Sequence, residues 1–163
     1  MTDALSWLTP RPVSLGHPAP AGLDPGVQVL MLPGGALSLG ADPTGPGEAA
    51  ARAAACAPHV PADAVLCRGS AVWVHTGRLR PAHVEAAHPA GRRLPGGSRR
   101  CRSATLDDAD VVILHGVRVT SPVRTGADLA RFWPVGRAAD GLIALREAGL
   151  DLVAVTALLA GYG

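Results

Sequence analysis

The sequence predicts an α/β protein in which a small mixed or antiparallel sheet is flanked by helices, with a three-helix C-terminal segment and a Pro/Gly-rich N-terminal arm. Two short apolar runs, Val111–Leu114 and Val117–Thr120, are separated by His115-Gly116, which is typical of a hairpin with a two-residue turn. Ser121-Pro122 follows directly and offers an N-cap residue with proline at the first helical position. These residues therefore predict a hairpin that is followed directly by a helix, which is the main evidence for the α/β fold class.

Proline and glycine dominate the start of the chain. The first 46 residues hold eight of the 15 prolines and seven of the 20 glycines, which disfavour helix, so we expect a mostly extended arm. Within it, residues 27–32 and 36–39 flank a Pro-Gly-Gly turn and predict a short hairpin. We place the domain boundary here, with an arm over residues 1–46 and an α/β domain over residues 47–163.

The centre of the chain alternates between helical and extended patterns. Residues 48–57 form an alanine-rich segment that Pro58 ends, and this predicts a helix. Residues 64–76 suit a strand or a buried helix equally well, and we favour the helix. Residues 84–88 and 98–104 predict strands, so the sheet is expected over about residues 84–120, between helices in 47–76 and 122–161.

Three helices are expected at the end of the chain. The first runs from Pro122 to Trp133, and the second continues to Gly149. Asp151 then caps a third helix, which has Leu152, Val155 and Leu159 on one face.

Composition excludes several classes of function. All 15 basic residues are arginine, so Schiff-base chemistry, the P-loop and kinase sites are excluded because each requires lysine. The three cysteines are widely spaced, and residues 1–20 have no positive leader or apolar run. We therefore expect reduced thiols, a cytoplasmic location and no membrane span.

One segment of the sequence resembles a known family. The residues that carry the resemblance are the Arg-Gly-Ser-Ala-Val-Trp run at 68–73, Val84-Glu85 with the following loop at 91–93, and above all residues 115–125. From 62 to 161 the order of these motifs is similar to the C-terminal region of AbiEi-type antitoxins, which are paired with nucleotidyltransferase-like toxins. The resemblance implies DNA or such a toxin as partner. Its motif residues, for which we favour a structural role, are Thr120, Ser121, Pro122, Arg124 and Thr125.

The sequence departs from this family at two places. Gly126-Ala127 stand where the family has bulkier apolar residues, so we expect looser packing of that helix. The larger departure is the lack of the family's N-terminal winged helix, since residues 1–46 cannot supply its three helices. The predicted hairpin in this region corresponds at most to the wing.

Arginine is concentrated in one stretch. Seven of the 15 arginines fall within 25 residues that contain a single acidic residue, Glu85. Guanidinium groups bind phosphate through two parallel hydrogen bonds, so a basic loop of this kind is a candidate for holding nucleic acid or an acidic partner; a solvated loop is the simpler interpretation. The candidate residues are Arg78, Arg80, Arg92, Arg93, Arg99, Arg100 and Arg102.

No pattern completes a catalytic, cofactor or metal site. The cysteines and histidines lack the short spacings of zinc ligands, and no cofactor is expected. We therefore expect a non-enzymatic, antitoxin-like or transcriptional-regulatory protein. Two alternatives remain: an interaction module, homodimeric or otherwise, that does not bind DNA, and a metal-dependent phosphodiesterase using Asp107, Asp108 and Asp110.

Overall fold

The computed structural model describes residues 28–32, 35–39, 48–88 and 105–162, and side chains for the last two ranges. Its elements follow in the order β1 (Gln28–Leu32), β2 (Gly35–Leu39), α1 (Ala49–Cys56), the 3-10 helix η2 (Ala57–His59), β3 (Val65–Leu66), α2 (Arg68–Thr76), β4 (Ala86–Ala87), the 3-10 helix η3 (Asp108–Asp110), β5 (Val111–Leu114), β6 (Val117–Thr120), α3 (Pro122–Phe132), α4 (Val135–Glu147) and α5 (Leu152–Ala160).

The main sheet has four strands in the order β4-β3-β6-β5. Strand β3 lies antiparallel to β4 and parallel to β6, and β6 pairs antiparallel with β5. The turn between β5 and β6 places His115 at φ 46° and Gly116 at φ 81°, and a two-residue turn with both φ values positive matches the twist of the strands it joins. The sheet is therefore small and mixed, and the predicted α/β fold class is confirmed.

The predicted N-terminal hairpin is present. Strand β1 pairs antiparallel with β2 from Gln28 opposite Leu39 to Leu32 opposite Gly35. Gly35 already belongs to the second strand, so the connection is one residue shorter than the three-residue turn we expected.

Caps at the predicted positions begin two of the three C-terminal helices. The Ser121 hydroxyl accepts a hydrogen bond from the backbone N–H of Arg124, and Pro122 is the first residue of α3. The Asp151 carboxylate accepts from the N–H of Val153 at 2.8 Å and begins α5. Helix α4 ends before Gly149, whose φ of 99° only glycine adopts without strain.

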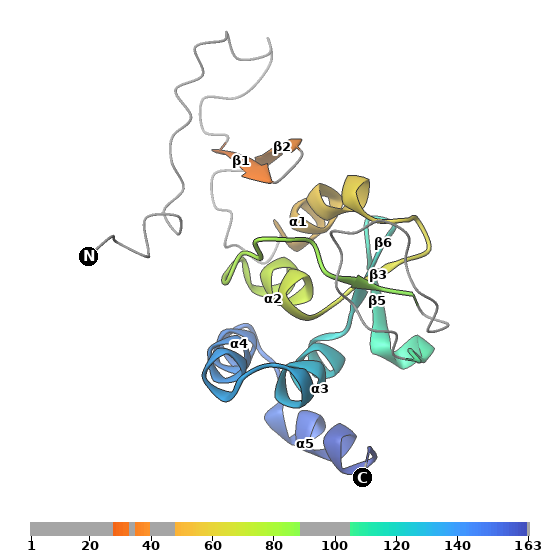
Figure 1. Cartoon of the computed structure of the whole chain (residues 1–163), viewed down its shortest axis with the longest axis vertical. Helices are drawn as coiled ribbons and strands as arrows, with labels where there is room; N and C mark the ends of the chain where they lie inside the picture. The colour runs from red at the N-terminus through yellow and green to blue at the C-terminus, as the bar shows by residue number, and fades with distance from the viewer. Residues whose placement is uncertain (1–27, 33–34, 40–47, 89–104, 163) are drawn as a thin grey trace, which may run out of the picture.

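Helix α2 lies between two apolar clusters. In Figure 1, α1 and the sheet lie on one side of α2, and α3, α4 and α5 lie together on the other. Trp73 and Val74 belong to the first cluster, with α1 and the sheet, whereas Val72 belongs to the second, with the C-terminal helices. These two faces of α2 are therefore buried, and only Arg68 and His75 in this helix are partly exposed.

Two expectations from the sequence are wrong. Residues 64–76 are not one helix, because Val65–Leu66 form a strand and the helix begins only at Arg68. The local pattern of residues 64–76 suits a strand or a helix equally well. Val65–Leu66 are a strand because they pair with β4 and β6. The expectation of three reduced thiols also fails, because Cys67 is disulfide-bonded, whereas Cys56 is free and buried. Spacing along the chain says nothing of which sulfur atoms meet in space.

Candidate functional site

The motif at residues 120–125 makes contacts inside the fold. Arg124 is only 3% exposed, and its guanidinium contacts Asp128 at 3.0 Å and Asp110 at 2.6 Å. Burial alone would lower the pKa of Arg124, but the two carboxylates raise it above its ordinary value, so the side chain stays charged. The hydroxyls of Thr120 and Thr125 lie 2.7 Å apart and are fully buried. These bonds join the sheet to α3.

The predicted basic loop falls mostly outside the described residues, since Arg92, Arg93, Arg99, Arg100 and Arg102 all lie in the range 89–104. Of the other two candidates, Arg78 is exposed and forms an ion pair with Glu147 near the end of α4. Burial lowers the pKa of Arg80, which lies near the Cys56 thiol. Neither side chain belongs to the arginine group described next.

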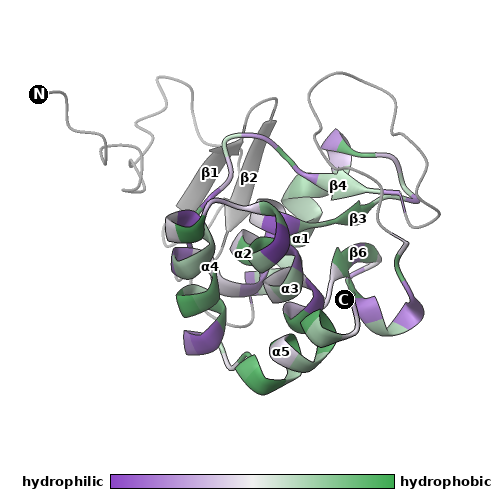
Figure 2. Ribbon diagram, turned by 60° about the horizontal axis from the view of Figure 1, so that its bottom comes forward, coloured by the Kyte–Doolittle hydropathy of each residue, from purple (hydrophilic) through white to green (hydrophobic). Residues whose placement is uncertain are grey.

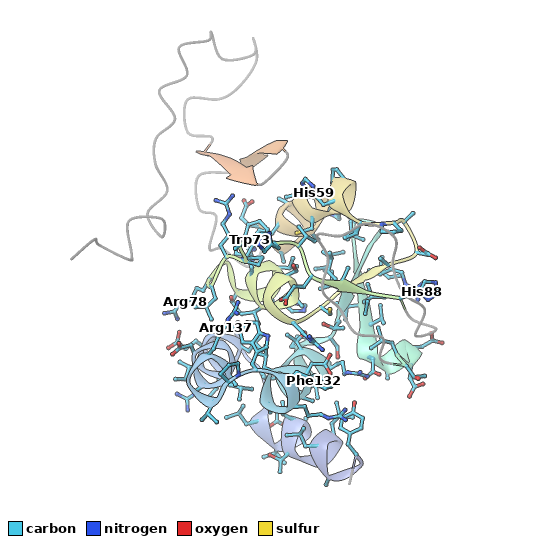
Figure 3. All side chains as sticks on the ribbon, in the orientation of Figure 1. His59, Trp73, Arg78, His88, Phe132 and Arg137 are labelled. Carbon is cyan, nitrogen blue, oxygen red and sulfur yellow. The ribbon has the colours of Figure 1, made fainter. Side chains whose placement is uncertain are left out.

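A second group of arginines stacks on aromatic rings at the surface. The guanidinium carbon of Arg68 lies 4.6 Å from the centre of the Phe132 ring, and that of Arg131 lies 5.0 Å from the same ring and 4.1 Å from the ring of Tyr162. Beside them, Arg137 lies 3.9 Å from the ring of Trp133. We call this group the arginine–aromatic surface; it comprises Arg68, Arg131, Phe132, Trp133, Arg137 and Tyr162. Figure 3 shows two members, Phe132 at the end of α3 and Arg137 at the start of α4.

Hydrogen bonds to Glu85 fix the backbone that carries Arg68. The carbonyl of Glu85 accepts from the N–H of Cys67 at 3.0 Å, its carboxylate accepts from the N–H of Gly69 at 2.7 Å, and its own N–H donates to the Ser70 hydroxyl at 2.8 Å. Arg68 itself has a φ of 47°, which is uncommon for a residue with a side chain. Such conformations persist where the surroundings impose them, and here three hydrogen bonds do so.

Glycine at position 69 lets the parts of this surface approach one another. A Cβ atom there would lie 2.7 Å from the Glu85 carboxylate and 3.3 Å from the Trp133 ring. The first turn of α2, the Glu85 side chain and the end of α3 therefore meet at this glycine. The surface is assembled by three segments that are distant in sequence.

Within the part of the chain whose side chains are described, the three arginines of this surface form no ion pair; the pairs present involve Arg78, His88 and Arg124. Two carboxylates nevertheless interact with them through space: Asp128 with Arg68 and Arg131, and Glu85 with Arg68 and Arg137. Burial raises the pKa of the Glu85 carboxyl, whereas the Gly69 hydrogen bond and the charges of Arg68 and Arg137 lower it. A guanidinium stacked on a ring keeps its in-plane N–H groups available, so these arginines can donate paired hydrogen bonds to phosphate or carboxylate.

Sequence reasoning missed this surface, although one signal was present. Arg131-Phe132-Trp133 are consecutive, and Arg137 follows Trp133 closely, across the Pro134 break between two helices. The contributions of Arg68 and Tyr162 had no such signal, since they approach Phe132 and Arg131 only in the folded chain.

The acidic cluster before β5 is used for local structure. Asp107 and Asp110 form a capping box at the start of η3: the Asp107 carboxylate accepts from the backbone N–H of Asp110, and the Asp110 carboxylate accepts from the N–H of Asp107 at 3.1 Å. Asp110 also binds Arg124. Among the described residues, no three His, Cys, Asp or Glu side chains are grouped so that they could hold a metal ion.

Helix α5 presents apolar residues to solvent. Between Leu152 and Ala160 it contains no charged residue, and Figure 2 colours it mainly white and green. Its Val155 is buried, but Val153 is 75% and Leu152 is 39% exposed. Helical spacing placed Leu152 on the same face as Val155, but Leu152 is not buried as Val155 is. None of the described helices has the length and hydropathy needed to cross a membrane.

Comparison of the chain with protein-family models, with curated proteins and with solved structures gives no match. The resemblance to AbiEi-type antitoxins therefore stays a prediction from the residues at 68–73, 84–93 and 115–125.

Proposed function

We propose that this protein is a non-enzymatic, antitoxin-like or regulatory protein that acts by binding nucleic acid through the arginine–aromatic surface. The observation that carries the proposal is the stacking of Arg68, Arg131 and Arg137 on aromatic rings without a carboxylate partner among the described residues. Arginines interleaved with aromatic rings suit nucleic acid, because guanidinium groups bind phosphates and rings stack on bases.

Two of the arginines lie at the N-terminal ends of helices, and this position also favours a ligand that carries phosphate. Arg68 lies in the first turn of α2 and Arg137 in the first turn of α4, where the helix dipole favours negative charge. The first turn of α4 has no side-chain cap, and a Cβ at Gly136 would meet no atom within 4 Å. The space beside Gly136 in this turn is therefore open.

Binding should be measured with the whole protein on labelled DNA from upstream of its own gene and on scrambled DNA, across a salt series. The first variant replaces Arg68, Arg131 and Arg137 with glutamine; the second replaces Arg92, Arg93, Arg99 and Arg100 with alanine; the matched control is Arg146→Gln, an exposed arginine on α4. Each phosphate contact that is lost should reduce the salt slope by about one unit.

We expect the first variant to lose about three units of slope and the control to lose none. Loss confined to the second variant would move the site to the basic loop and contradict the assignment to the arginine–aromatic surface. Preference for the gene's own upstream DNA would support a regulatory role. Absence of binding to any DNA at low salt would refute the proposal.

A second candidate function is an interaction module that forms a homodimer through α5. The exposed, uncharged face of that helix favours it, because a helix that is apolar on all sides is normally covered. A second copy suits this face, since an apolar helix without charge is complementary to itself in a two-fold interface. Light scattering would show a dimer that Val153→Asp converts to a monomer; a monomer at all concentrations would exclude it.

A further inference from the structure

We infer that the arginine–aromatic surface binds single-stranded nucleic acid, with unpaired bases stacked against Phe132 and Tyr162 and phosphates held by Arg68 and Arg131. This inference rests on the proposed function and specifies its ligand. Its basis is a row in which guanidinium groups and rings alternate: the buried Arg124, then Tyr162, Arg131, Phe132 and Arg68, with 5.8 Å, 4.1 Å, 5.0 Å and 4.6 Å between successive centres.

The two rings of this row are partly exposed to solvent. Phe132 is 46% and Tyr162 is 38% exposed, whereas Trp73, in the first core cluster, is 2% exposed. Both rings therefore offer accessible ring surface beside Arg68 and Arg131, which form no ion pair among the described residues. Phe132 has no polar atom, so its exposed ring offers a ligand only stacking or apolar contact.

The placement of these groups favours a single strand over a duplex. A base offers its face to an aromatic ring only when it is unpaired and unstacked, and such stacking does not depend on the base sequence. Proteins that read a duplex insert the side of a helix or a strand pair into a groove. Here the groups project from the end of α3, the first turns of α2 and α4, and a residue after α5, so no helix side is presented. We therefore assign the rings to stacking and the arginines to phosphate, with Arg131 between the two rings and Arg68 beside Phe132.

Three probes of equal length and equal label separate base stacking, phosphate binding and duplex binding. They are a 12-nucleotide oligothymidine, the same backbone without bases, and a 12-base-pair duplex. Fluorescence anisotropy with the whole protein gives the affinity for each. We expect oligothymidine to bind at least tenfold more tightly than the abasic strand, since a tenfold change corresponds to about 1.4 kcal/mol and two bases can stack.

Variants assign the stacking to particular rings. Phe132→Leu and Tyr162→Leu keep apolar bulk at exposed positions and remove the ring, so each should weaken oligothymidine binding about fivefold and leave the abasic strand unchanged. Arg131→Gln should weaken both strands to the same extent. Arg146→Gln, on the exposed part of α4, is the control for loss of one charge.

The outcomes separate this inference from the proposed function. Equal affinity for the three probes would overturn the single-strand assignment and leave nucleic-acid binding intact. An equal loss for both strands in Phe132→Leu would show that the ring only positions arginines, which also overturns it. Binding of none of the probes at low salt would overturn both and leave the surface to a protein partner.

Discussion

Arg124 is a charged side chain inside the protein, held by Asp110 and Asp128 and by the carbonyl oxygen of Thr105. Replacing it with methionine leaves the Asp128 carboxylate, 4% exposed, without its partner in α3. Because an unpaired buried charge is costly, we expect Arg124→Met to lower the free energy of unfolding by about 3–5 kcal/mol in urea denaturation. Arg146→Met, at an exposed position, should change it by less than about 0.5 kcal/mol. A loss below about 1 kcal/mol in Arg124→Met would show that the contacts of Arg124 with Asp110 and Asp128 contribute little to stability.

The negative charge of Glu85 interacts with both Arg68 and Arg137. Glutamine at this position keeps an oxygen that can accept from the Gly69 N–H and removes the charge. We therefore expect Glu85→Gln to bind oligothymidine about threefold more tightly at low salt, because less negative charge faces the incoming phosphates. Anisotropy titration measures this, with Glu147→Gln, whose carboxylate pairs with Arg78, as control. Weaker binding would indicate that Glu85 positions Arg68 only when ionised.

Helix α3 approaches α5 through Gly126. A Cβ atom there would lie 3.0 Å from Val155, 3.2 Å from Leu150 and 3.3 Å from Leu142, so the glycine is needed for close packing, and the looser packing expected from the sequence is not found. Gly126→Val should cost about 1–3 kcal/mol of unfolding free energy through overpacking. Gly136→Val, where a Cβ would meet no neighbour, is the matched control. Similar stability of the two variants would refute this account.

His75 connects α2 to the end of β6, where its ring nitrogen Nε2 donates to the carbonyl oxygen of Thr120 at 2.7 Å. Burial lowers the pKa of this imidazole below its ordinary value of 6.5, although the hydrogen bond to Thr120 opposes the shift. The folded protein thus binds this proton less readily than the unfolded chain does. The stabilisation is complete above pH 6.5 and is lost as the pH falls from there through the lowered pKa.

We expect the wild-type protein to lose more unfolding free energy between about pH 7.5 and about pH 5 than His75→Gln does. Glutamine can still donate to the carbonyl of Thr120 but does not titrate. Urea denaturation at the two pH values measures the difference, and all other titrating groups are common to both proteins. Parallel pH dependence in the two would show that His75 contributes nothing to it.

At the scale of the whole molecule, α2 is shared by two apolar clusters and should make them unfold together. Val72 contributes to the cluster with α3, α4 and α5, and Val74 to the cluster with α1 and the sheet. Each change to alanine leaves a cavity in a different cluster, and we expect a loss of about 2 kcal/mol from either.

Both variants should shift one common transition, because a helix buried on both faces cannot lose one cluster and keep the other intact. Near-UV circular dichroism and far-UV circular dichroism recorded on the same urea series test this. Transitions that separate in either variant would mean that the clusters are independent.

Local chemistry made much of the fold predictable. The β5–β6 turn, the Ser121 and Asp151 caps and the end of α1 shortly before Pro58 all depend on residues within a few positions of one another. The identity of residues 64–76 was not predictable in the same way, because the strand at Val65–Leu66 exists only through its pairing with β4 and β6. Turns and caps are determined by neighbouring residues, whereas the pairing of β3 with β4 and β6 joins residues that are distant in sequence.

The candidate site divides in the same manner. The sequence by itself determined that this chain has arginine as its only strong cation, that arginine is clustered along the chain, and that Arg131-Phe132-Trp133 adjoin. Only the tertiary structure brought Arg68 and Tyr162 to those rings, fixed Arg68 through Glu85, and left one face of α5 uncovered. The physical reason is that capping and turn formation are decided by neighbours in sequence. Stacking between distant side chains is decided by packing, which no local pattern records.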